Sequence, residues 1–323
     1  MIDNKKIIVV IPAYRVAAQI ENVVHGIPLF VDKTIVIDDK CPENSGVIVE
    51  ELKLSNVTVI YHQNNQGVGG AVITGYRAAI ADGADVIVKI DGDGQMDSSL
   101  IKLFVMPIMA GEADYAKGNR FFNLEKIRTM PIARLFGNAI LSFITKLSSG
   151  YWDLFDPNNG YTAIHADIAR LLPFDKISQR YFFETDMLFR LNTLRAVVVN
   201  IPMDAKYGDE VSNLKISKIF GEFFIKHMRN FLKRIFYNYY LRDMSLASIE
   251  LPLGILLIIS GSCYGVYHWI KSLNEGIITP PGTVMLAALP ILMGLQLILA
   301  FLGYDIASVP RRPVHVSRHN AKK

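Results

Sequence analysis

The stretch VIVKIDGDGQMD, residues 86–97, decides the fold, because an apolar strand runs there directly into an acidic, glycine-containing turn. Similar short runs rich in Val and Ile recur upstream, and segments that allow a helix separate them. The expected strands are 7–11, 34–37 and 57–61, and the expected helices between them are 16–27, 46–53 and 67–81. This alternation with short connections predicts an α/β fold built on a doubly wound sheet.

Asp91 and Asp93 lie where that strand ends, which is where ligands of doubly wound sheets bind. Two carboxylates this close favour a cation between them, and oxygen ligands favour Mg²⁺ or Mn²⁺. Gln95 adds a carbonyl oxygen to this predicted metal site. The structural alternative is an acidic turn in which the glycines only permit tight geometry.

Other strand ends suit a nucleotide. Pro12 and Tyr14 offer an aromatic face for stacking on a base, and Asp38 or Asp39 accepts a base N–H or a ribose hydroxyl. As an alternative, the two aspartates cap the loop that follows them. The glycine-rich turn at 67–70 lets the backbone approach a ligand, but it matches neither the Walker loop nor the dinucleotide fingerprint. ATP hydrolysis and hydride transfer therefore lose support.

The composition points to a membrane. Hydrophobic residues make up 51% of the 323 residues and the mean hydropathy is +0.26, too apolar for an ordinary soluble enzyme. The excess lies in two runs, 249–270 and 284–304, each long enough to cross a hydrocarbon core of about 30 Å. The alternative is a pair of buried core helices. Two cysteines exclude a disulfide framework and a zinc cluster, and a net charge of +4 does not demand nucleic acid, so no nucleic-acid partner is predicted.

Basic residues lie on one side of both runs. A segment at 215–242 combines large apolar side chains at helical spacing with lysines and arginines, which is typical of a helix in a membrane interface, although a helix packed on the domain core is the alternative. More arginines and lysines follow the second run, whereas the loop between the runs has one basic residue. This asymmetry predicts a cytosolic catalytic domain. The expected domains are 1–214 (catalytic), 215–245 (amphipathic), 246–306 (two membrane helices) and 307–323 (a basic cytosolic tail).

The motifs together resemble a known family. IVVIPAY (8–14), IDD (37–39), NQGVGGAVITGYRAA (65–79), KIDGDGQMD (89–97) and KGNR (117–120) are similar to those of family-2 GT-A glycosyltransferases. With two membrane spans behind them, the motifs look like those of the dolichyl- or polyprenyl-phosphate sugar synthases. The resemblance implies a GT-A fold, a nucleotide-sugar donor, a polyprenyl or dolichyl phosphate acceptor and contact with membrane lipids.

The resemblance also implies roles for single residues. Those expected to hold the nucleotide are Pro12, Tyr14, Asp38 or Asp39, Gly67 and Val68, and those expected to hold the metal at the diphosphate are Asp91, Asp93 and Gln95. Arg120 and Arg134 fall where relatives bind the acceptor phosphate. Lys206 and Ser212 lie in a segment that closes over the site in relatives. Glu184 and Asp186 resemble the region where relatives with hydroxyl acceptors keep a catalytic base, and solvated or capping carboxylates are the alternative.

Some positions depart from the family pattern. Arg15-Val16 stands where members often have Asn-Glu, Met96-Asp97 stands where they have His-Pro or Asp-Pro, and 160–165 lacks an arginine found in members. These departures put one nucleotide contact and some sugar or acceptor contacts in question.

The sequence therefore predicts an inverting transferase that moves a hexose from a UDP- or GDP-sugar to a polyprenyl or dolichyl phosphate. It would act at the cytosolic face of a bacterial or archaeal plasma membrane or an ER-type membrane. The alternatives are a transferase with a hydroxyl acceptor and a non-catalytic scaffold that binds a nucleotide-sugar. A processive polysaccharide synthase is disfavoured, because this sequence lacks the Gln-x-x-Arg-Trp motif of those enzymes. Small residues in the spans, Gly254, Gly261, Gly265 and Gly294, permit helix contacts. A homo-oligomer, a tetramer by resemblance, is expected.

Overall fold

The computed structural model describes residues 4–122, 132–204 and 216–321, and the side chains of these except at 132–136, 216–220 and 319–321. The chain forms two compact units. The first contains residues 1–231 together with 310–323, and the second contains residues 232–309. The C-terminal residues that follow the apolar runs thus belong to the same unit as the N-terminal domain.

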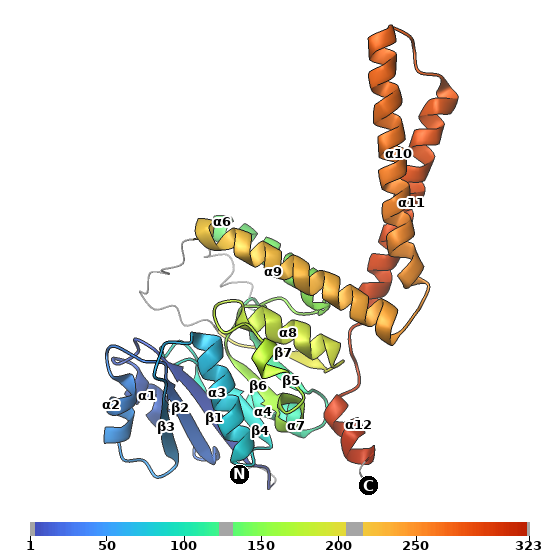
Figure 1. The fold of residues 1–323 in the computed structure, drawn as a ribbon. Coiled ribbons are helices and arrows are strands. Elements are labelled where there is room, and N and C mark those ends of the chain that lie inside the picture. The colour runs from blue at the N-terminus through green and yellow to red at the C-terminus, as the bar shows by residue number, and fades with distance from the viewer. Residues whose placement is uncertain (1–3, 123–131, 205–215, 322–323) are drawn as a thin grey trace. The chain divides into compact units, whose positions relative to one another are not determined.

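A seven-stranded mixed sheet forms the centre of the first unit (Figure 1). Its strands are β1 (Ile7–Ala13), β2 (Lys33–Asp38), β3 (Val57–Tyr61), β4 (Val86–Lys89), β5 (Tyr115–Asn119), β6 (Thr162–His165) and β7 (Val198–Pro202). Their order is β3-β2-β1-β4-β6-β5-β7. β6 runs antiparallel to β4 and β5, while the other pairs are parallel. The α/β prediction is confirmed.

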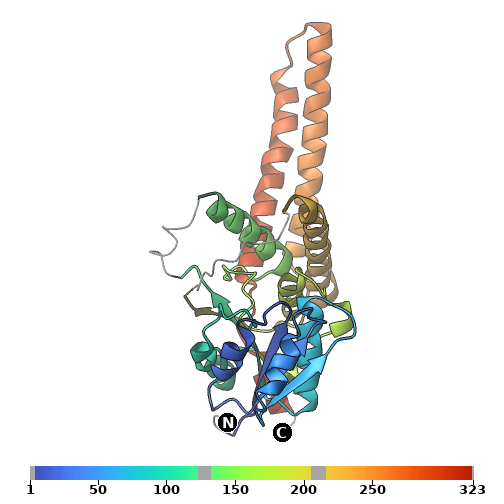
Figure 2. The same cartoon turned by 90° about the vertical axis from the view of Figure 1, so that its left-hand side faces the viewer.

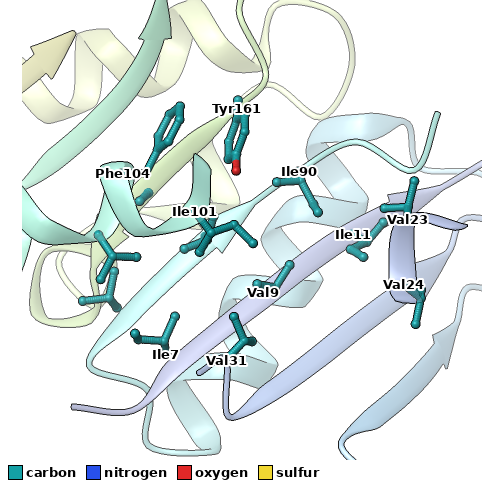
Figure 3. Packing of buried hydrophobic residues seen from close by; sticks show 14 of the residues in the cluster. Ile7, Val9, Ile11, Val23, Val24, Val31, Ile90, Ile101, Phe104 and Tyr161 are labelled. Atoms are coloured by element: carbon teal, nitrogen blue, oxygen red, sulfur yellow. The ribbon is translucent and has the colours of Figure 1, made fainter. Parts of the chain in front are cut away.

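Helices cover both faces of this sheet. The helices between β1 and β7 are α1 (Ile20–His25), α2 (Ser45–Glu51), α3 (Val68–Ala81), α4 (Ile101–Met109), α6 (Ile132–Ser149), α7 (Ala166–Ala169) and α8 (Phe183–Thr193), with short 3-10 turns at Ser98–Leu100 and Phe174–Lys176; α6 packs on α8. Alternate residues of β1 face opposite sides. Val9 packs with α1 and α4, as Figure 3 shows, whereas Val10 meets α3 at Gly75, where a Cβ would collide with the valine side chain.

Two strands in the second half of the domain, β5 and β6, were not recognised as strands from the sequence. On the α4 side, Phe104 stacks on Tyr161 with ring centroids 3.9 Å apart (Figure 3). Tyr161 immediately precedes β6, a strand of four residues that the apolar pattern did not reveal, and β5 was noticed only as the KGNR motif. Both are short and flanked by glycine or polar residues, so neither has the period of an ordinary strand.

The helix α9 (Ile216–Phe236) leads out of the first unit, and a π-helical turn follows at Tyr237–Arg242. In the second unit, α10 (Ala247–Glu275) and α11 (Pro281–Ala307) run side by side (Figures 1 and 2). Both are long and apolar enough to cross a membrane, and only 11% of the most apolar window of each is buried. A core helix of a soluble protein would be mostly buried, so α10 and α11 are candidate membrane spans.

Glycines bring α10 and α11 together. A Cβ on Gly254 would lie 2.9 Å from the carbonyl oxygen of Gly294, and a Cβ on Gly294 would lie 2.6 Å from that of Gly254. Gly261 approaches Ala287 and Gly265 lies against the same residue. Small residues allow such close backbone contact. The four glycines predicted to permit helix contacts therefore make them within one chain, and the homo-oligomer stays a prediction.

A buried ion pair lies in the second unit, between Arg234 of α9 and Asp305 near the end of α11. Arg234 donates to both carboxylate oxygens of Asp305, at 2.6 and 2.9 Å, and both side chains are almost fully buried. The Tyr239 hydroxyl donates to the same carboxylate. Removing one member would leave a buried charge without its partner, which is strongly destabilising. The last turns of α9 are thereby joined to the end of α11.

The C-terminal helix α12 (Val314–Ala321) packs on the first unit through one buried carboxylate. Asp114 accepts hydrogen bonds from the backbone N–H groups of Val197, Val314 and His315 and from the His315 ring. The His315 ring also stacks on His165, 4.2 Å between centroids. Residues expected in a basic tail thus form an ordered helix held by the catalytic unit.

We expect Asp114→Asn to lower the free energy of unfolding by roughly 2–4 kcal/mol, because an amide cannot accept from donors on both of its sides. Urea titration in detergent, followed by Trp152 fluorescence in a Trp269→Phe background, measures this loss. Burial alone would raise the pKa of Asp114, but its hydrogen bonds hold the pKa below the ordinary value. The contribution is therefore present above the unfolded pKa and lost as pH falls through the lower folded pKa.

Asp167→Asn is the control, because Asp167 forms an exposed pair with Arg170 and should change stability by less than about 0.5 kcal/mol. Equal stability of the Asp114→Asn and Asp167→Asn proteins would contradict the role given to Asp114.

Candidate active site

A cleft of about 1460 Å³ opens at the carboxyl ends of β1 and β4. The strand order reverses between these two strands, and ligands of open α/β sheets bind at such a point. The volume exceeds the roughly 300–1,000 Å³ of ordinary small-molecule pockets, so it has room for two substrates. Of the predicted site residues, those that line the cleft are Pro12, Tyr14, Asp39, Gly67, Val68, Asp91, Asp93 and Glu184.

The acidic turn after β4 forms one wall. Asp91 and Asp93 are half-buried, and Asp93 accepts a hydrogen bond of 3.0 Å from the backbone N–H of Gln95. Gln95 itself is not among the residues that line the cleft. Among the described residues, no group of three or more His, Cys, Asp or Glu side chains is arranged to hold a metal ion. Two carboxylates with substrate phosphates suffice for Mg²⁺ or Mn²⁺, so the donor set fits such an ion.

A lysine lies beneath this wall. Lys89, the last residue of β4, is 2% exposed, and its Nζ lies 2.6 Å from Asp91 Oδ1 and 3.7 Å from Glu184 Oε1. Burial alone would lower the pKa of Lys89, but the charges of Asp91 and Glu184 outweigh it and raise the pKa above its ordinary value. Lys89 is therefore a cation. Sequence reasoning passed over it, although a charged residue inside an apolar strand was a usable signal.

Glu184 consequently has a charge partner. Its proposed role as a base competes with its pairing to Lys89, and Glu184 also attracts the buried Lys117. Burial lowers the pKa of Lys117 to about 8, even though Glu184 and Asp156 oppose the shift. The Lys117 ammonium donates to the backbone oxygen of Asn159 at 2.5 Å. Glu184 thus attracts two buried lysines, Lys89 and Lys117.

The pair Asp38-Asp39 is buried and makes several hydrogen bonds within the protein. Asp38 accepts from the backbone N–H groups of Cys41 and Gly46, and it is not among the residues that line the cleft. Asp39 does line it, and accepts from the backbone of Gln66 and Gly67 and from the His62 ring. Both aspartates therefore hold loops. For Asp39, a contact with the nucleotide stays a prediction.

Gly67 shows why the glycine turn needs its glycines. Its φ of +87° is strained for other residues, and a Cβ there would lie 2.8 Å from the backbone oxygen of Gln179 and 2.9 Å from Arg180 Cγ. The turn at Gly67 and the loop before α8 are therefore packed against each other at the edge of the cleft.

Of the two arginines predicted to bind the acceptor, the structure describes the side chain of Arg120 but not that of Arg134. Arg120 donates from Nε and from a terminal nitrogen to the two oxygens of buried Asp156, at 2.7 and 3.0 Å. It is not among the residues that line the cleft. Arg134 belongs to α6, but its side chain lies outside the described residues, as do Lys206 and Ser212. Acceptor binding by these residues stays a prediction.

Asp186 does not reach the cleft. It is buried on α8 and accepts from the backbone N–H of Ser178 and from the Asn230 side chain, at 2.9 and 3.0 Å. Asn230 belongs to α9, so Asp186 joins two helices and a loop. These contacts give Asp186 a structural role, and its part as a catalytic base stays a prediction.

Arg180 is a cation that sequence reasoning missed. It lines the cleft, is exposed, and has no ion-pair partner among the described residues. Exposed Tyr181 lies beside it in the loop before α8. No pattern in the sequence distinguished this arginine, because only the packing of its loop against Gly67 brings it to the cleft.

Apolar side chains of two helices form another wall of the cleft. Ile140, Leu141 and Ile144 come from α6, and Phe223 and Phe224 come from α9. Ile140 is 57% exposed and Phe224 50% exposed, and both lie beside further exposed apolar residues of the same helices, Phe143, Ile225 and Met228. α9 also packs on the domain, through hydrogen bonds of His227 and Asn230. α9 therefore packs on the core and also presents an apolar surface.

The model of the family described as glycosyl transferase family 2 matches residues 8–172, half of the chain. The chain belongs to that family. It is therefore a glycosyltransferase, and the predicted membership and activity are confirmed.

Relatives of this family-2 glycosyltransferase act on lipid phosphates according to their names. The UDP-N-acetylglucosamine–dolichyl-phosphate N-acetylglucosaminyltransferase of Methanococcus voltae is 32% identical over 64% of this chain and 88% of its own length. The undecaprenyl-phosphate mannosyltransferase of Micrococcus luteus is 27% identical over 61% of this chain and 82% of its own. The polyprenol monophosphomannose synthase of Mycolicibacterium smegmatis is 25% identical over 62% and 77%.

A solved structure supports the fold of the family-2 glycosyltransferase. Glucosyl-3-phosphoglycerate synthase from Mycobacterium tuberculosis, in complex with Mn²⁺, UDP and its product, superposes with a TM-score of 0.53. The identity is 19%, over 72% of this chain and 80% of that one. The predicted GT-A fold is confirmed by this likeness.

His227, which lines the cleft of this glycosyltransferase, provides a pH prediction. Burial lowers its pKa from 6.5 to about 4. As pH falls, this histidine therefore binds its proton at a higher pH in the unfolded chain than in the folded protein. The free energy of unfolding should consequently decrease as pH drops from about 6.5 to about 4. We expect His227→Gln to flatten the slope of unfolding free energy against pH in that window, measured by the urea titration described above.

Burial likewise lowers the pKa of His165 to about 4, so His227→Gln should remove only part of the slope. Exposed His25, paired weakly with Glu21, supplies the control, and His25→Gln should keep the full slope. An unchanged slope in His227→Gln would contradict the assignment.

Proposed function

We propose that this glycosyltransferase moves a hexose from a UDP- or GDP-linked donor to a polyprenyl or dolichyl phosphate. The supporting observation is the cleft itself, which has carboxylates on one wall and exposed apolar helices on the other. A nucleotide diphosphate with its metal suits the first wall, and an isoprenoid chain suits the second. The relatives that act on dolichyl, undecaprenyl and polyprenol phosphates support the same substrate class.

The reaction requires little acid–base chemistry from the protein. An anionic oxygen of the acceptor phosphate attacks the anomeric carbon, the bond from that carbon to the nucleoside diphosphate breaks, and the diphosphate leaves with the electron pair. A phosphate monoester loses its second proton near pH 6, so no base is needed. The anomeric configuration inverts in this single displacement.

Residues of the chain orient the two substrates. Asp91 and Asp93 would hold Mg²⁺ or Mn²⁺, which neutralises charge on the departing diphosphate. Tyr14 and Asp39 would hold the nucleoside, and exposed Arg180 is placed to bind a phosphate oxygen. Arg120 would bind the acceptor only by exchanging its bonds to Asp156.

A membrane location follows from the same proposal. α10 and α11 would span the bilayer, and the excess of Lys and Arg on one side of both helices would place the first unit in the cytosol. The acceptor would then be drawn from the adjacent leaflet, with its isoprenoid tail against α6 and α9.

The direct test is transfer from a panel of labelled UDP- and GDP-sugars in membranes that contain polyprenyl phosphate, followed by lipid extraction. Label is expected in a lipid whose sugar is released by mild acid, as a glycosyl phosphate is. Label in a stable glycoside would contradict the phosphate acceptor and favour a hydroxyl acceptor. Absence of transfer with bound donor would favour the scaffold.

Asp93→Asn should reduce transfer at least about 100-fold, because loss even of outer metal partners costs up to that factor. Initial rates at saturating donor measure it. Asp97→Asn, in the same turn, keeps its bond to the Ser99 backbone and should transfer normally. Full metal-dependent activity in Asp93→Asn would remove the metal assignment.

Phe224→Ser should raise the KM for long-chain polyprenyl phosphate about tenfold, since it removes most of a phenylalanine's contact with the chain. The KM for a short, water-soluble isoprenyl phosphate and the KM for the donor should stay unchanged. Leu103→Ser is the matched control, because Leu103 is equally exposed but lies on α4 and does not line the cleft. Equal effects on long and short acceptors would contradict the apolar route.

A further inference from the structure

Lys89 occupies a position that an apolar residue would normally fill. Its neighbours in β4 are Val86, Ile87 and Val88, all buried. Burying an ammonium group costs free energy unless charges and hydrogen bonds compensate it. A leucine or methionine would suit the strand without that cost, so the buried charge of Lys89 indicates a functional role.

The compensation comes from two carboxylates that line the cleft. Asp91 Oδ1 lies 2.6 Å from Lys89 Nζ, and Glu184 Oε1 lies 3.7 Å from it. Gly160 closes the cluster, because any Cβ there would collide with Lys89 Nζ and lie 2.6 Å from Asp91 Oδ2. A backbone without a side chain therefore covers the pair and keeps it in contact.

Under the proposed function, Asp91 would be shared by two cations, Lys89 and the divalent ion. Asp91 is already neutralised by Lys89, and a divalent ion on Asp91 would have to bind within a few ångströms of a fixed positive charge. Repulsion between like charges weakens such binding. A donor diphosphate reverses this balance, since its negative charges attract both the ion and Lys89.

We infer that Lys89 makes metal binding at Asp91 and Asp93 conditional on the nucleotide, so that the ion is held firmly only together with the donor diphosphate. This inference rests on the proposed function, which supplies the metal and the donor. Because coupling between two ligands is reciprocal, the metal strengthens nucleotide binding by the same factor. Lys89 acts as a positioning residue through Asp91.

Direct binding of Mn²⁺ to the purified full-length protein in detergent tests this. Electron paramagnetic resonance measures free Mn²⁺, with and without UDP or GDP, and a titration without protein corrects for the Mn²⁺–nucleotide complex. In the unsubstituted protein, a nucleoside diphosphate should tighten Mn²⁺ binding at least about tenfold. This comparison needs no variant.

Variants then assign the effect to Lys89. Lys89→Met should bind Mn²⁺ without nucleotide at least about tenfold more tightly than the unsubstituted protein, and nucleotide should tighten Mn²⁺ binding by a smaller factor than it does there. Lys89→Arg keeps the charge and should retain the coupling. Glu184→Gln should weaken Mn²⁺ binding in the absence of nucleotide, which is the opposite of the effect of Lys89→Met, because Lys89 then pairs with Asp91 alone. Lys33→Met is the control, because Lys33, the first residue of β2, pairs with Asp82. This substitution should leave Mn²⁺ binding with and without nucleotide unchanged.

The outcomes separate this inference from the proposed function. Equal Mn²⁺ affinity with and without nucleotide overturns the coupling but leaves the metal site standing. No Mn²⁺ binding even with UDP or GDP overturns both the coupling and the metal site. A Lys89→Met protein that is folded by circular dichroism and binds Mn²⁺ as the unsubstituted protein does shows that Lys89 is only structural, and it overturns the assignment.

Discussion

The parallel pairing of β1 with β2 and β4 is the constraint on which the rest of the site depends. Val10 pairs with Lys89 and Ala13 pairs with Asp38, so the three strands end at one edge of the sheet. That edge brings Tyr14, Asp39 and Asp91 together from positions far apart in the chain. The close contact of Gly75 with Val10 holds α3 against the same strands and thereby sets the position of the turn at Gly67.

Several acidic residues of the first unit form hydrogen bonds that hold parts of the protein together. Asp39 orders the glycine turn, Asp156 fixes Arg120, and Asp186 joins α8 to α9. Buried carboxylates need hydrogen-bond donors, and backbone N–H groups of neighbouring loops supply them. Asp91 differs because its partner is the ammonium group of a lysine. A carboxylate paired with a cation can exchange that cation for another, whereas a carboxylate held by backbone N–H groups has no cation to exchange.

The second unit achieves its cohesion differently. Glycines let α10 and α11 approach through their backbones, and one buried Arg234–Asp305 pair joins the last turns of α9 to the end of α11. Apolar surface elsewhere on the two helices stays exposed, as is required of helices that face lipid. The return of the chain to the first unit through Asp114 and α12 means that the helix pair is inserted between two segments of that unit.

The sequence by itself determined the elements whose signals are local. The strands β1 to β4, the long helices and the acidic turn follow from apolar periodicity and from the DGDGQ stretch, because neighbouring residues alone create these patterns. Only the tertiary structure decided the antiparallel β6, the docking of α12, the pairing of Arg120 with Asp156, the approach of Arg180 to the cleft and the contact of Lys89 with Glu184. Each depends on partners 36 or more residues away, as with Arg120 and Asp156, or on a long-range fit of loops. The local sequence does not identify such partners, because the charge of a side chain does not determine which opposite charge lies next to it in the folded protein.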